Sequence, residues 1–267
     1  DDVMSVTPFA ARMAGGNAAL TARIEGGKVG EPGIGLTLNL AGSELSELGQ
    51  QLVGTSFASG KVNLALQAEA QGRSWLALVS SINGIGQISV NGAKLAPLDV
   101  GGFARVLEDA KSVDQLAGLK ADVLTTGQTN VQGLDGEVTI KDGLARMSRD
   151  ALVLDGGKAR LTAMYDFSRL AVDSELDVML DQPADAPGFS DVSSGRIGSV
   201  MRRVDVTALQ QFAAQRILAQ SVKDAGLDSL PDELSKLIGG TSKAADNDNA
   251  DGSAANVPVP IKRPVPR

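Results

Sequence analysis

Histidine and cysteine are both absent from this 267-residue chain. Their absence excludes Ser-His-Asp and Cys-His nucleophilic sites, thiolate and imidazole metal ligands, and a histidine general base near neutral pH. Aromatic residues make up only 3% of the sequence, and the formal net charge is −7. Base stacking needs more aromatic side chains, and a negative chain is repelled by a phosphate backbone. We therefore expect a protein that is not an enzyme, holds no metal or cofactor and does not bind nucleic acid.

Long apolar runs are absent as well. No stretch approaches the roughly 20 apolar residues that cross a bilayer as a helix. The chain starts at Asp1, without an initiator methionine or a charged-then-apolar leader. We expect it to be a processed piece of a longer protein, so the missing run says nothing about an anchor upstream of Asp1.

Apolar and polar residues alternate through most of the first two-thirds of the chain, as in strands with one apolar face. The pattern recurs in six segments: 33–42, 61–69, 133–143, 144–157, 158–167 and 170–180. Short turns separate the last four, and Asp142-Gly143 is a pair typical of a hairpin. The sequence predicts a mainly β fold with some α: a curved antiparallel sheet or groove, short packing helices and a C-terminal helical segment.

Amphipathic spacing and capping residues predict the helices. The expected helices are 43–54 with Ser43 as N-cap, a second short helix around 75–79, one after Asp99, one after Asp205, and a short one at 231–240. Three regions follow from this pattern. Residues 1–185 form a curved antiparallel β domain with inserted short helices, 186–240 a C-terminal helical segment, and 241–267 a disordered Pro-rich tail.

The run GIGQISVNGAKLAPLDVGGFARVL, residues 84–107, has two glycines of a dinucleotide-binding fingerprint. Ser89 stands where the third glycine belongs, and Ile88 and Val90 continue the strand pattern where the fingerprint would begin its helix. The segment therefore predicts a strand, then a helix capped by Asp99 that packs on the sheet.

Three carboxylates, Asp173, Glu175 and Asp177, occupy alternate positions of one predicted strand and so share a face. Such a row is suited to acid–base chemistry or a hard cation. It is also typical of the solvated face of a strand whose other side is apolar, and we favour this second interpretation.

The run at 84–107, together with TNVQGLDGEVTIKDGLARMSRDALVLDGGKARLTAMYDFSRLAVDSELDVML, resembles the C-terminal region of bacterial AsmA-like proteins. The common pattern is a Gly-spaced strand, NGxKLxxxDV leading into a helix, LxGxxxIxxG, a strand ending in a Gly pair, and xxDxxLxVxL. It covers about residues 80–185 of the β region, and the downstream RRVDVTALQQFAAQRILAQ is similar to the helix that closes many members. Near Val131 the family's usual phenylalanine is replaced.

The resemblance implies a periplasmic protein of Gram-negative bacteria, attached to the inner membrane by an anchor upstream of this chain and active in outer-membrane biogenesis. Larger relatives form bridge-like β-grooves associated with phospholipid transport. The expected partners are therefore phospholipid acyl chains, a membrane and an envelope protein. The alternative is a scaffold or regulator of outer-membrane protein assembly and targeting that acts through protein contacts.

Apolar strand positions supply the expected lipid-binding groove. Burying one methylene stabilises by ~0.8 kcal/mol, so a concave face of such residues would hold an acyl chain. The same side chains would otherwise pack as an ordinary closed core, and this alternative stays open. The residues of the expected groove are Val62, Leu64, Leu66, Val138, Ile140, Leu161, Leu176 and Val178.

Overall fold

The computed structural model describes residues 2–26, 32–56, 58–110 and 127–224. The chain divides into two units, Asp1–Ser221 and Val222–Arg267. The sheet belongs to the first unit; of the second, only 222–224 are described, as the last turn of a helix. The helix expected at 231–240 and the tail from 241 onward lie outside the described residues.

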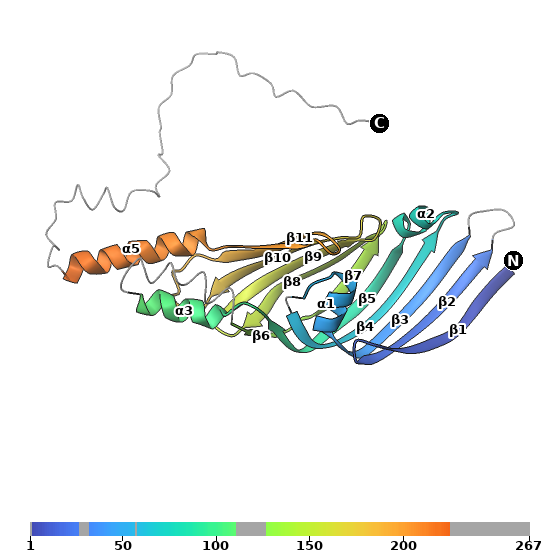
Figure 1. Cartoon of the computed structure of the whole chain (residues 1–267), viewed down its shortest axis with the longest axis horizontal. Helices are drawn as coiled ribbons and strands as arrows, with labels where there is room; N and C mark the ends of the chain where they lie inside the picture. The colour runs from blue at the N-terminus through green and yellow to red at the C-terminus, as the bar shows by residue number, and fades with distance from the viewer. Residues whose placement is uncertain (1, 27–31, 57, 111–126, 225–267) are drawn as a thin grey trace, which may run out of the picture. The chain divides into compact units, whose positions relative to one another are not determined.

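Within the described residues, twelve strands form one curved antiparallel sheet, and strands make up 57% of the structure (Figure 1). Neighbours in sequence pair along the order β1-β2-β3-β4-β5-β6-β8-β9-β10-β11-β12, while β7 pairs with β5 and β8. The predicted mainly β, antiparallel fold is confirmed. The strands are β1 (Asp2–Met13), β2 (Gly16–Gly26), β3 (Gly33–Glu44), β4 (Ala58–Gln71), β5 (Asn83–Leu95), β6 (Thr129–Gln132), β7 (Asp135–Lys141), β8 (Leu144–Leu154), β9 (Gly157–Asp166), β10 (Ala171–Leu180), β11 (Phe189–Arg196) and β12 (Met201–Asp205).

Among the described residues, four helices connect or follow these strands: α1 (Leu45–Leu52), α2 (Trp75–Ser80), α3 (Val100–Asp109) and α5 (Thr207–Asp224). Asp99 is the N-cap of α3 as expected, whereas α5 begins at Thr207, so that Asp205, the last residue of β12, lies one residue before the N-cap position. The Asp99 carboxylate accepts a hydrogen bond from Gly102 N at 2.7 Å, and that of Asp205 accepts one from Thr207 N at 3.1 Å. Both interactions satisfy N–H groups that a first helical turn leaves without partners.

Ser43 does not cap α1, so that prediction is wrong. A bulge after Leu40 lets β3 continue to Glu44, and Ser43 pairs with Val62 in the sheet. Its fully buried hydroxyl donates to Met13 O at 2.9 Å instead. The hydroxyl thus ties β3 to the end of β1.

The sheet extends past the expected boundary at 185, because β11 and β12 precede the C-terminal helix. Their sequences, FSDVSSGR and MRRVD, alternate small, polar and charged residues rather than apolar ones. The corrected β region therefore ends at Asp205. The helix that follows was predicted correctly, and its Leu209, Ala213 and Ile217 are buried.

The main core lies toward the end of the sheet where α3 and α5 pack (Figure 1). Leu98, Val100 and Phe103 are fully buried there, and the Phe103 ring lies 5.0 Å from that of Phe189 at the start of β11. As expected, α3 packs on strands. Toward the opposite ends of the strands, alternating residues of the same face are only half-buried.

Candidate functional site

One face of the sheet, which we name the inner face, carries all eight residues of the expected groove. Directly paired residues of antiparallel strands point to the same side. One row of paired residues crosses from β3 to β12: Leu38, Leu66, Gly86, Val138, Met147, Ala163, Ser174, Ser193 and Arg202. A second row, nearer the core, includes Leu64, Ile88, Leu161, Leu176 and Asp191.

Burial divides the eight residues into two groups. Val62, Ile140, Leu176 and Val178 are buried, with exposed fractions of 1–7%. The others are half-buried: Leu64, Leu66, Val138 and Leu161. The inner face therefore combines buried apolar positions with a partly open apolar surface.

A cavity of about 360 Å³ lies between the inner face and the segment that contains α1. This volume is within the range of roughly 300–1,000 Å³ that is usual for small-molecule sites. Of the eight expected residues, only Leu161 and Leu176 line it. The further apolar lining residues are Leu45, Val53, Ala58, Ile88, Val90, Ala93, Leu95, Val131, Leu134, Met147, Leu152, Ala163, Val172 and Val200.

The roof of the cavity is residues 45–56, which we name the α1 strap. Its end reaches the turn between β11 and β12, where Gly198 N donates to Val53 O at 3.1 Å. A Cβ atom on Gly54 would lie 3.2 Å from the Gly198 backbone, so this contact favours glycine. The strap, which is part of the connection between β3 and β4, thus contacts a turn far away in the sequence. No local sequence pattern indicates this contact.

The side of the cavity formed by β10, β11 and the turn after β11 carries polar groups among the apolar side chains of Val172, Leu176 and Val200. Asp191 Oδ2 accepts from Arg202 Nη2 at 2.7 Å, and the two side chains are only 11% and 13% exposed. Arg202 Nη1 also donates to Pro97 O at 3.0 Å, which ties β12 to the segment before α3. Asp191, Ser174 and Ser193 line the cavity. The site is therefore mainly apolar, with Lys94 on β5, Thr55 and Ser56 on the strap, and hydroxyl and charged groups on β10 and β11 as its polar lining.

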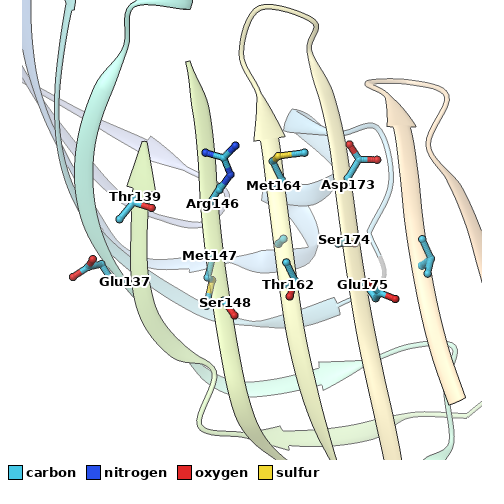
Figure 2. Close-up of a pocket in the computed structure, with 12 residues that line it drawn as sticks. Glu137, Thr139, Arg146, Met147, Ser148, Thr162, Met164, Asp173, Ser174 and Glu175 are labelled. Atoms are coloured by element: carbon cyan, nitrogen blue, oxygen red, sulfur yellow. The ribbon is translucent and has the colours of Figure 1, made fainter. Parts of the chain in front are cut away.

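The outer face carries a second hollow, of about 530 Å³, over β7 to β11. Figure 2 shows its side chains in rows across the strands, with Thr139, Arg146, Met164 and Asp173 in one row. Asp173, Glu175 and Asp177 are exposed, in agreement with the solvated-face interpretation. In the part of the chain that the structure describes, no group of three or more acidic side chains is placed to hold a metal ion.

Among the residues that the structure describes, the ionisable groups with shifted pKa values lie away from the cavity, at the turn between β9 and β10. Hydrogen bonds from Ser168 and the backbone of Arg169 lower the pKa of Asp166. Burial and the nearby Asp166 carboxylate raise the pKa of Tyr165. The pKa of Asp166 is lowered as expected for a carboxylate that caps N–H groups in a turn, whereas that of Tyr165 is raised mainly by burial.

Comparison of the chain with protein-family models, with curated proteins and with solved structures gives no match. Among the described helices, none combines the length and the apolar character needed to cross a bilayer. What the chain does must therefore be argued from the cavity and its surroundings.

Proposed function

We propose that this chain is a lipid-handling module of an AsmA-like protein and binds phospholipid acyl chains in the cavity beneath the α1 strap. In this proposal the module lies in the periplasm, is attached to the inner membrane in the full-length protein, and contributes to phospholipid transfer toward the outer membrane or to its homeostasis. It catalyses no reaction. The observation that carries the proposal is the apolar cavity on the inner face, which continues into half-buried leucine and valine side chains.

The shape and chemistry of the cavity support an amphiphile over a fully polar ligand. Its lining from α1, β5, β8 and β9 offers hydrocarbon contact, and each methylene buried there stabilises the complex by ~0.8 kcal/mol. Ser174, Ser193 and the Asp191–Arg202 pair supply polar groups on one wall. A phospholipid has both parts: its acyl chain fits the apolar lining, and its ester oxygens accept hydrogen bonds from hydroxyl groups.

Native mass spectrometry with lipid extraction tests this function on protein purified gently from bacterial membranes. The expected result is stoichiometric phospholipid in the wild-type protein. Leu161→Asp, in the cavity lining, should lose it, and Thr162→Asp, on the exposed side of the same strand, should retain it. Circular dichroism checks that each variant folds.

A third variant guards against the possibility that a buried charge unfolds the sheet. Ala163→Leu adds apolar volume to the cavity lining without a charge, and we expect it to fold and to carry less lipid. A folded wild-type protein without lipid, and with no lipid uptake from vesicles, contradicts the proposal. It would favour the alternative function, a scaffold for outer-membrane protein assembly, which crosslinking through α5 would then examine.

A further inference from the structure

The end of the sheet opposite α3 has a continuous border, which we name the α2 rim. It consists of residues 72–82, which include α2, and the turns 141–144, 166–170 and 196–200. Backbone hydrogen bonds join these segments. Gly143 N donates to Ile82 O at 2.9 Å, Phe167 N to Gly143 O at 3.0 Å, and Ile197 N to Leu170 O at 2.8 Å. The rim is therefore one connected surface, with α2 at the ends of β4 and β5 (Figure 1).

Large apolar side chains are exposed along this rim. Trp75 is 79% exposed, Leu76 62% and Leu170 50%, and Trp75 is the only tryptophan in the chain. The helix that carries the first two is firmly held: Ser74 Oγ accepts from Ala77 N at 3.2 Å, and Val79 on its other side is buried. The structure thus presents an aromatic and an aliphatic side chain to the outside on a fixed element.

The charges of the α2 rim differ in sign from those of the whole chain. The rim carries four cations and two carboxylates, whereas the chain has a formal charge of −7. One of the carboxylates, Asp166, accepts hydrogen bonds from Ser168 and Arg169 of its own turn and forms an ion pair with the Arg169 side chain at 3.7 Å, so these two charges add nothing to the net positive charge of the rim. The exposed cations are Arg73, Lys141, Arg169 and Arg196.

We propose that the α2 rim is a membrane-docking surface that binds the interfacial region of an anionic phospholipid bilayer. Tryptophan prefers this region because its ring is apolar and its N–H is polar, and leucine gains by entering the acyl boundary. Cations near an anionic surface add an electrostatic attraction that salt screens. This inference goes beyond the proposed function, because docking needs only the exposed rim and does not require the cavity to hold lipid.

The single tryptophan makes the test direct. Trp75 fluorescence is recorded while the protein is titrated with vesicles of phosphatidylcholine alone or with phosphatidylglycerol, and with brominated lipid as a quencher. We expect a blue shift and quenching with the phosphatidylglycerol vesicles, both weakened by salt. Trp75 does not line the cavity, so its emission reports on the rim rather than on a cavity ligand.

Variants separate the apolar and the electrostatic contributions. Leu76→Ser should weaken vesicle binding by about ten-fold, since it removes most of a buried leucine's transfer free energy. Arg73→Gln with Arg196→Gln should weaken it by roughly 25-fold, about five-fold for each cation. The matched control is Leu218→Ser on α5, a leucine that is 56% exposed away from the rim, and it should leave binding unchanged.

No change in Trp75 emission with phosphatidylglycerol vesicles at low salt overturns the proposal and leaves the rim as a contact surface for a protein. Equal effects of Leu76→Ser and Leu218→Ser overturn it too, because binding would then not depend on the rim. Ala163→Leu distinguishes the two proposals: it should reduce co-purified lipid but leave vesicle docking intact.

Discussion

The Asp191–Arg202 pair links β11, β12 and the segment before α3, and its disruption should weaken the wall of the cavity. Asp191→Asn preserves the size of the side chain but leaves the guanidinium without its counter-charge. Because both side chains are nearly buried, the pair belongs with buried ion pairs, for which removal of one partner costs about 3–5 kcal/mol. We expect the lower end, about 3 kcal/mol, since a small part of each side chain still reaches solvent.

Thermal and urea unfolding, followed by circular dichroism, measure this cost. For a protein of this size, a loss of about 3 kcal/mol lowers Tm by about 6–12 °C. Two variants complete the experiment. Asp191→Asn with Arg202→Gln removes both charges and should cost less than the single change, because no buried charge stays uncompensated. Arg160→Gln breaks the exposed pair with Asp150 and should cost at most about 1 kcal/mol.

The reasoning is refuted if Asp191→Asn costs no more than Arg160→Gln, because burial would then not make the pair structurally important. If Asp191→Asn with Arg202→Gln is at least as unstable as Asp191→Asn alone, the lost hydrogen bonds cost more stability than the uncompensated buried charge. Either outcome would mean that the β12 edge is held by its backbone pairing and not by this side-chain contact.

Three further predictions concern the rim and the cavity. Gly143→Ala should lower the free energy of unfolding by more than about 2 kcal/mol, because Gly143 has φ of 72° and an added Cβ would overlap the Val79 carbonyl oxygen. Gly92→Ala is the control, at φ of 62° with open space around it, and should cost only about 1 kcal/mol when both variants are unfolded with urea. Asp166→Asn should cost about 1 kcal/mol at pH 7. Since the folded-state pKa of Asp166 is lowered, this contribution is present above the unfolded pKa and is lost as pH falls through the folded pKa, so the two proteins should converge in stability in acid. Val53→Pro should disturb the hydrogen bond from Gly198 N to the carbonyl oxygen of residue 53 and so loosen the α1 strap. We expect faster exchange of a bound fluorescent phospholipid, measured by stopped-flow dequenching. Unchanged exchange would show that the strap does not cover the cavity entrance.

The sheet could be predicted from the sequence because most of its strands carry their own signal, the alternation of apolar and polar residues. In β3, β4 and β10, every second residue is apolar, and the paired register confirms that these residues share one face. The cap of α3 was equally predictable, since an Asp ahead of an amphipathic run satisfies N–H groups locally. These features depend on residues close in the sequence.

The features that build the site depend on contacts between distant residues. The α1 strap has the sequence of an ordinary amphipathic helix, and only the contact of Val53 with Gly198 reveals it as a roof. β11 was missed because its inner positions, Asp191 and Ser193, are polar where the apolar pattern was expected. Asp191 forms an ion pair with Arg202, and Ser193 lines the cavity, neither of which sequence periodicity shows.

The measurement that most directly tests the central claim is site-specific photocrosslinking in cells. Benzoylphenylalanine replaces Val172, which lines the cavity, or Asp173, the next residue of β10, which faces the outer hollow. Adducts are identified by mass spectrometry. The proposed function predicts phospholipid adducts from position 172 and few from position 173. Protein adducts alone, or equal lipid labelling at both positions, would contradict it.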